Sequence, residues 1–148
     1  MTKLWSKGYE LEPAVERFGA ARNAALDAEL ARHDLWGSLA YARMLRHVGL
    51  LDEAEWHALD GGLRALLAEV EHGGLRPSLA DEDIHTTIEN TLIERIGAPG
   101  KQLHTGRSRN DQVLLDLRLY AKEALLHLTE SALDLAADLL ALARAHEW

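Results

Sequence analysis

Apolar residues recur every three or four positions along most of the chain, which is the spacing of amphipathic helices. Separate stretches of this pattern predict helices over about residues 24–32, 36–48, 53–72 and 84–96. An earlier helix is expected to begin near Pro13, because proline suits a first helical turn, and to break around Gly19. Asp52 and Glu55 have the spacing of a capping box at the start of the third of these helices. The pattern predicts an all-α protein.

The longest stretch begins at Ser108 and runs without glycine or proline to about Ala145. Its apolar positions step along the helix in threes, fours and one seven: Val113, Leu117, Tyr120, Ala124, Leu128, Leu135, Leu139 and Leu142. Such a helix would be about 55 Å long, whereas a compact globule of this chain length is only about 40 Å across. We therefore expect other subunits, or more residues of a longer protein, to cover its far end. The lack of a helix stop before Trp148 favours a truncated chain.

The composition and charge agree with a soluble helical protein and exclude several other classes. Hydrophobic residues make up 47% of the chain but aromatic residues only 5%, and there is no cysteine to form a disulfide or a thiolate site. No apolar stretch approaches the roughly 18–20 residues that span a bilayer, and no signal peptide is evident. With a net charge of −8 and no long basic run, the chain is not expected to bind nucleic acid.

The candidate chemistry lies in residues 104–113, where polar side chains surround one glycine directly before the long helix. Ser108 and Asp111 have the spacing of a helix N-cap, so free backbone N–H groups and the positive end of the helix dipole are expected there. Arg107 and Arg109 add two guanidinium groups. This combination predicts a site for a carboxylate or a phosphate.

The same run resembles the HTGRSRND motif of the argininosuccinate lyase family, in the fumarase/aspartase superfamily. Two further segments are similar to that family: residues 34–38 to its D-[IV]-x-G-S segment, and residues 83–89 to its E-D-[IV]-H-x-x-x-E segment. Leu4 and Trp5 resemble the opening of its LWGGRF motif, but residues 6–9 depart from that motif. Superfamily members that act on other substrates carry different residues in the first motif, so the match is to the argininosuccinate-cleaving branch.

The resemblance implies a fold and an assembly. In the family a small helical domain precedes a central bundle of long helices, which builds a homotetramer. On that analogy residues 1–107 form the N-terminal helical domain, and residues 108–148 form the first long helix of the central bundle, cut short. The chain would then be the N-terminal portion of the enzyme, about its first third.

The resemblance also implies the reaction, the reversible elimination that cleaves argininosuccinate into arginine and fumarate in cytoplasmic arginine biosynthesis. The substrate-binding residues that carry over are Asn23, where the family has serine, with Asp27, Ser108, Arg109 and Asn110. The catalytic histidine and serine are expected beyond Trp148, so no catalytic residue is predicted in this chain, which should be inactive alone. No metal or other cofactor is implied. Two alternatives stay open: a non-catalytic, crystallin-like structural member of the superfamily, and a helical interaction module.

His85 and Glu89 lie one helical turn apart and could together ligate a metal ion. Two ligands at this spacing are weak evidence for a metal site, and a capped acidic helix start with an exposed histidine is the favoured interpretation. The remaining histidines outside the motif occupy ordinary helical positions and receive no predicted role: His33, His47, His57, His72, His127 and His146.

Overall fold

The computed structural model describes residues 23–75 and 83–146, and every regular element in these ranges is a helix. The elements are α2 (Asn23–Ala28), α3 (Ala31–His47), α4 (Glu53–Glu71), α5 (Ile84–Ile96), α6 (Ala98–Lys101), the short 3-10 helix η1 (Gln102–His104) and α7 (Arg109–Ala145). The predicted all-α class is confirmed. The helix expected near Pro13 and most of the loop after Leu75 lie outside the described residues. Within the described ranges, no helix combines the length and apolar character that crossing a membrane requires.

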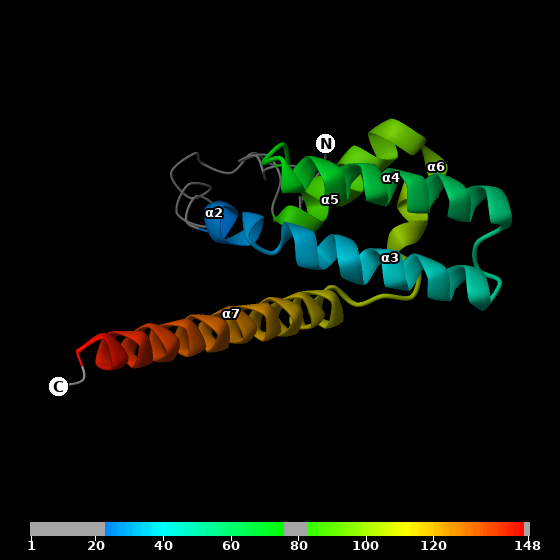
Figure 1. Cartoon of the computed structure of the whole chain (residues 1–148). Coiled ribbons are helices and arrows are strands. Elements are labelled where there is room, and N and C mark those ends of the chain that lie inside the picture. The colour runs from blue at the N-terminus through cyan, green and yellow to red at the C-terminus, as the bar shows by residue number, and fades with distance from the viewer. Residues whose placement is uncertain (1–22, 76–82, 147–148) are drawn as a thin grey trace.

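Helices α3, α4 and α5 form the body of the molecule, with α3 packed along α4 and α5 packed against both (Figure 1). The apolar positions that recur every three or four residues in α4 and α5 supply six of the twelve buried apolar side chains described, which confirms the register of these two helices. Buried apolar side chains come from six positions on these two helices: Leu59, Leu63, Leu66, Ile84, Ile88 and Leu92. Helix α3 adds Leu35 and Leu45, both at most 1% exposed, and the other buried apolar residues are Ala31, Ala42, Leu51 and Leu103. Burial of apolar surface is what holds these three helices together.

The predicted start of α4 is confirmed in atomic detail. The Asp52 side chain accepts a hydrogen bond from the Glu55 backbone N–H at 2.8 Å, and the Glu55 side chain accepts one from the Asp52 backbone at 3.0 Å. This reciprocal pair satisfies two of the backbone donors that a helix start leaves free. At the other end the chain turns at Gly73, whose φ of +74° is a conformation that residues with a side chain rarely adopt.

Some predicted boundaries were wrong. The break expected between residues 32 and 36 lies instead at Glu29 and Leu30, because their backbone N–H groups close a turn onto the carbonyl groups of Leu26 and Asp27. Helix α3 then continues from Ala31 without interruption, since its first turns are buried in the core. The apolar spacing over residues 36–48 predicts one face shared by Leu39, Ala42, Met44, Leu45 and Val48. Of these, Met44 is 39% exposed and Val48, just past the end of α3, is 56% exposed. The sequence Ala98-Pro99-Gly100 predicts a turn, but these residues belong to the short helix α6.

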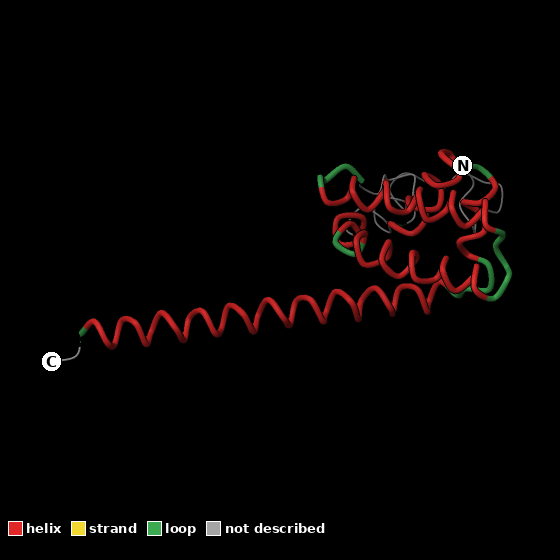
Figure 2. Tube along the Cα trace, turned by 45° about the vertical axis from the view of Figure 1, so that its right-hand side comes forward, coloured by secondary structure: helices red, strands yellow, loops and turns green. Residues whose placement is uncertain are grey.

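Helix α7 is a straight rod of 37 residues that leaves the body at one end (Figures 1 and 2). Gly106, with a φ of +70°, turns the chain toward it, and Ser108 caps it by accepting a hydrogen bond from the Asn110 backbone at 3.3 Å. The cap at Ser108 was predicted, although its bond runs to Asn110 and not to Asp111. Beyond Glu123 every described residue of the rod is exposed.

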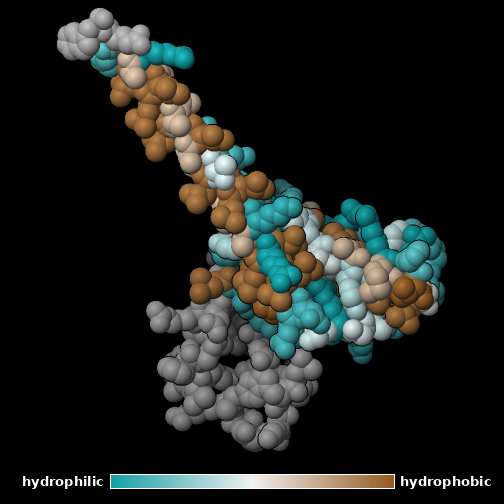
Figure 3. All heavy atoms as spheres, turned by 90° about the horizontal axis from the view of Figure 1, so that it is seen from below, coloured by the Kyte–Doolittle hydropathy of each residue, from teal (hydrophilic) through white to brown (hydrophobic). Residues whose placement is uncertain are grey.

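The exposed part of α7 carries the apolar stripe that the sequence predicted, and Figure 3 shows hydrophobic side chains along much of the rod. Eight leucines beyond residue 124 are 57–66% exposed: Leu125, Leu126, Leu128, Leu133, Leu135, Leu139, Leu140 and Leu142. Contact with the body is confined to the first part of the helix. There Glu123 contacts Arg32 and lies 2.9 Å from His33 Nε2, and the His33 ring packs edge-on against Tyr120.

Gly37 sets how closely α7 approaches α3. A Cβ atom at this position would lie 3.0 Å from Leu115 Cδ2, 3.5 Å from Asp116 Oδ1 and 3.6 Å from Arg107 Nη2. The first of these distances is tighter than ordinary van der Waals contact. The missing side chain therefore makes room for the start of α7.

We expect the Gly37→Val substitution to lower the free energy of unfolding by about 1–3 kcal/mol, because the branched side chain must displace α7 from α3. The matched control is Gly61→Val in α4, where an added Cβ meets nothing within 4 Å. That control should be neutral or slightly stabilising, since valine is a better helix former than glycine. Urea unfolding followed by circular dichroism measures both, and equal stability of the two variants would contradict the proposed close packing.

Candidate functional site

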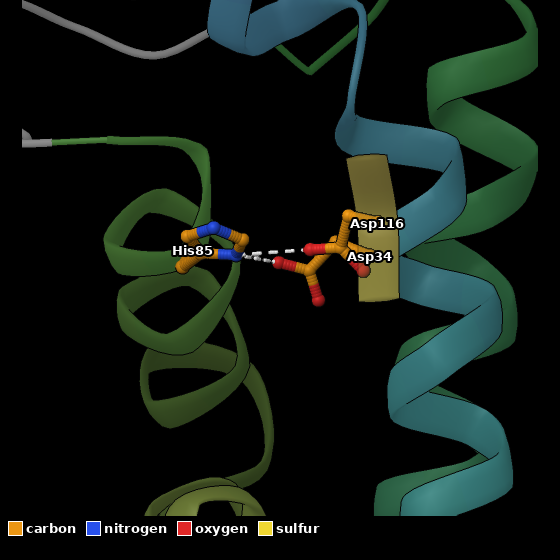
Figure 4. Close-up of side chains that lie close together, drawn as sticks. All are labelled: Asp34, His85 and Asp116. Atoms are coloured by element: carbon orange, nitrogen blue, oxygen red, sulfur yellow. Dashed lines mark hydrogen bonds and ion pairs between the residues drawn. The ribbon is translucent and has the colours of Figure 1, made fainter. Parts of the chain in front are cut away.

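Three helices meet at a buried polar cluster made of Asp34 from α3, His85 from α5 and Asp116 from α7 (Figure 4). The exposed fractions of the three residues are 0%, 4% and 0%, and one ligand-type atom of each lies within 4.8 Å of the others. In Figure 4 both carboxylates point toward the imidazole. These residues are 31 to 82 positions apart in the sequence, so only the fold brings them together.

Asp34 is the centre of the cluster, and its carboxylate accepts hydrogen bonds from Ser38, His85 and Gln112. Ser38 Oγ donates to it at 2.7 Å, Gln112 Nε2 reaches both carboxylate oxygens at 3.0 Å, and His85 Nδ1 contacts it directly. Burial alone would raise the pKa of Asp34, but these donors and the charge of His85 outweigh burial and lower it. Burial would likewise lower the pKa of His85, and the bond to Asp34 raises it. Asp34 and His85 thus form an ion pair inside the protein.

Asp116 is the unbalanced member of the cluster. Its carboxylate lies 3.7 Å from His85 Nδ1, but neither of its oxygens has a hydrogen-bond partner among the described residues, and Gln112 Oε1 has none there either. Burial, followed by the negative charge of Asp34, raises the pKa of Asp116 to about 7. The cluster therefore contains more acceptors than donors, and a proton on Asp116 relieves this excess.

Aspartate and histidine are residue types that bind metal ions, but the hydrogen bonds of this cluster favour a structural role, in which a buried ion pair joins the helices. Asp34 already accepts from Ser38, Gln112 and His85, so a metal ion would have to displace the His85 proton and separate a direct ion pair. Glu89 does not join His85 in the described structure but contacts His104 at 3.3 Å, so the alternative that His85 and Glu89 together ligate a metal ion has no support. The prediction that His85 is exposed is also wrong, since Asp34 holds it in the interior.

Two of the predicted substrate-binding residues, Arg109 and Asp27, lie beside the first turn of α5. Arg109 donates to Asp83 Oδ1 at 3.2 Å and to Thr86 Oγ1 at 3.0 Å. Asp83 is also the N-cap of α5 and accepts from the Thr86 backbone at 2.8 Å. The pKa of Asp27 is raised, chiefly by burial and also by the negative charge of Asp83. A hydrogen bond with the Ile84 backbone and the positive charge of Arg109 oppose this rise. The fold thus brings Asp27 and Arg109 to one place.

The other predicted site residues lie at helix starts. Ser108 and Asn110 are both exposed at the start of α7, next to Arg109. Asn23 is the first residue of α2, and its side chain lies outside what the structure describes.

Arg107 faces away from this group, although the sequence suggested that it acts together with Arg109. Its Nη1 donates to Ser38 Oγ at 3.2 Å, and its guanidinium group stacks over the Tyr41 ring at 4.9 Å. The Tyr41 hydroxyl in turn donates to the Thr105 carbonyl at 2.8 Å. Arg107 therefore fastens the loop before α7 to α3, and of the two arginines only Arg109 lies beside Asp27.

The sequence of the whole chain is similar to those of known proteins. A family model described as Lyase matches residues 13–147, and the chain therefore belongs to this lyase family. Among its relatives are the argininosuccinate lyases of Thioalkalivibrio sulfidiphilus, 50% identical over 126 residues, and of Desulforudis audaxviator, 42% identical over 148 residues. The argininosuccinate lyase of Desulfitobacterium hafniense is 40% identical over 147 residues. The resemblance found in the sequence is confirmed.

The matches differ greatly in how much of each protein they cover. They include 83%, 99% and 98% of this chain, respectively, but only 26%, 32% and 32% of the three relatives. The chain thus spans about a quarter to a third of the length of the curated relatives it matches.

The cluster predicts a particular dependence of stability on pH. Because the pKa of Asp116 in the folded chain is about 7, well above its ordinary value of 3.8, the folded state binds a proton that the unfolded state releases. The contribution of Asp116 to stability therefore falls as the pH rises through the interval between these values. Since the pKa of His85 is raised, its contribution is present below its ordinary value of 6.5 and is lost as the pH rises through its folded value. Asp34, with a lowered pKa, contributes above its ordinary value of 3.8 and loses that contribution in acid.

We expect Asp116→Asn to become more stable relative to the unmodified chain as the pH rises, because it removes the buried carboxylate. The difference in unfolding free energy between the two should change by roughly 2–4 kcal/mol between about pH 4.5 and about pH 8. Asp138→Asn makes the same chemical change at an exposed position of the same helix and should leave the pH profile unaltered. Urea unfolding at a series of pH values gives the comparison, and parallel profiles for Asp116→Asn and the unmodified chain would disprove the assignment.

Proposed function

We propose that this chain supplies the substrate-binding part of an argininosuccinate lyase, which cleaves argininosuccinate reversibly into arginine and fumarate. The identity of 40–50% to argininosuccinate lyases along most of the chain supports this proposal. The observation that carries it is the arrangement around Arg109, a cation fixed by Asp83 and Thr86 next to the start of α7. Arginine biosynthesis in the cytoplasm is the corresponding biological role.

The chemistry of the reaction agrees with this arrangement. Removing a proton next to a carboxylate creates an intermediate with additional negative charge, which fixed N–H donors and cations stabilise. A guanidinium group carries five N–H donors, and Arg109 uses two contacts on Asp83 and Thr86, which leaves donors for a substrate carboxylate. Ser108 and Asn110 add an exposed hydroxyl and an exposed amide at the positive end of α7. We assign all three to the succinyl carboxylates, with Asp27 and Asn23 beside them.

The proton-transfer groups are assigned to residues outside this chain. In the proposed assembly, a homotetramer, the apolar stripe of α7 packs against long helices of other subunits, and the site is completed by residues that those subunits contribute. The exposed leucines beyond residue 124 support such an arrangement, because stripes of this size are normally covered.

We expect the purified 148-residue chain to release no fumarate from argininosuccinate above the uncatalysed background, because the base and the acid are supplied elsewhere. Coupled detection of fumarate by its hydration to malate measures this. A turnover that persists through purification and is lost on replacing Arg109 would show that the chain is complete as a catalyst.

Activity can be tested in a chimera in which this chain replaces the matching segment of the Thioalkalivibrio sulfidiphilus enzyme. We expect the chimera to cleave argininosuccinate, and Arg109→Leu to lower its kcat/KM by roughly a hundredfold or more, because a fixed cation at developing charge is lost. Arg43→Leu, at an exposed position of α3, should change kcat/KM less than twofold if surface charge has only a weak effect. An assembled but inactive chimera would favour the non-catalytic structural member, and near-normal turnover of Arg109→Leu would reject the role given to Arg109.

A further inference from the structure

We propose that Asp34 is a positioning residue for the anion site, because it holds both sides of the Arg109 ion pair in place through His85 and Gln112. The inference rests on the proposed function for the identity of the ligand, a dicarboxylate. Its structural basis is the set of contacts that link Asp34 to Arg109 through α5 and α7, all within the described chain.

The first side of the ion pair belongs to α5. Both partners of Arg109, Asp83 and Thr86, lie in the cap and first turn of this helix, immediately around His85 in the sequence. His85 points into the interior and contacts Asp34 on α3. The position of the Arg109 partners is therefore fixed by the contact between Asp34 and His85.

The second side belongs to α7. Gln112 is three residues after Arg109 and is 1% exposed, and its amide donates to both oxygens of Asp34 at 3.0 Å. Residues three apart lie on neighbouring parts of a helix surface, so this bond fixes the first turn that carries Arg109. The same carboxylate thus binds the helix that bears the cation and the helix that bears its counter-ion.

The remaining attachment of the α7 start also leads to Asp34. Arg107, in the loop before α7, donates to Ser38 Oγ, and Ser38 donates to Asp34 Oδ1. The hydrogen-bond partners of the Asp34 side chain in the described residues are Ser38, His85 and Gln112, and all three are donors. An asparagine of the same shape would replace one acceptor oxygen with an NH₂ group and set donor against donor, with little change in volume.

The experiment compares Asp34→Asn with the unmodified 148-residue chain, using succinate as the probe because it is the dicarboxylate part of the proposed substrate. Two quantities are measured by nuclear magnetic resonance: the succinate affinity from shifts of the Asn110 backbone amide, and the side-chain Nε–H resonance of Arg109. Circular dichroism reports whether each variant keeps its helices. Asp138→Asn is the matched control, since it makes the same change at an exposed position of α7.

We expect folded Asp34→Asn to bind succinate at least tenfold more weakly and to shift the Arg109 Nε–H resonance toward that of a freely rotating side chain. Asp138→Asn should match the unmodified chain in both measurements. If Asp34→Asn does not fold, Gln112→Leu decides the matter, because it removes only the α7 link; it should weaken binding at least threefold and shift the same resonance.

The outcomes separate this inference from the proposed function. If the unmodified chain does not bind succinate, the groups of this chain do not form an anion site by themselves, and the Arg109 resonance alone decides whether Asp34 positions the Arg109 side chain. An Arg109 resonance and a succinate affinity that are both unchanged in a folded Asp34 or Gln112 variant would overturn the inference.

Discussion

The arrangement of the described helices depends on one buried carboxylate. Asp34 is fully removed from solvent, and a buried charge is costly unless donors surround it. Its donors come from α5 and α7 as well as from its own helix, so the three helices must meet at one point and in one register. Apolar packing between α3, α4 and α5 would tolerate small displacements, whereas a hydrogen-bonded charge tolerates few. The carboxylate therefore defines where α7 begins relative to the body.

This constraint matters most for α7, because little else attaches the helix. Gln112 and Asp116 are its only buried residues in the described chain; Asp116 belongs to the polar cluster and Gln112 donates to Asp34. Further contacts, among them those of Glu123 with Arg32 and His33, lie on a partly exposed edge. The helix is thus attached to the body by polar groups, while its leucines remain on the surface. The polar contacts thus fix the direction of α7 at its N-terminal end, and the exposed leucines leave an apolar face along its C-terminal part.

The features that the sequence predicted well are local ones. The caps at Asp52 and Ser108, and the apolar register of α4 and α5, depend on residues three or four apart, and the structure confirms them. The Asp34 cluster could not be predicted in this way, because its bonds join residues 51 and 78 positions apart. Asp34 lies in the first turn of α3, where acidic residues are common in exposed helices, so its position gave no sign that it is buried. One signal was available: Asp116 occupies a position next to the apolar stripe of α7, between Val113 and Leu117, where a buried polar residue requires a partner.

The motif of residues 104–113 shows why its sequence alone did not separate structural residues from site residues. Arg107 binds α3 through Ser38 and Tyr41, Arg109 binds α5 through Asp83 and Thr86, and Gln112 binds Asp34 in the interior. These side chains leave the chain in different directions, because a loop residue and residues at different positions of a helical turn cannot face the same way. A motif that appeared to be a single anion site is thus also the attachment of α7 to two other helices. Several residues of the motif are therefore needed for helix packing, whether or not they contact a ligand. The motif identifies the family, but it does not by itself show which of its residues contact a substrate.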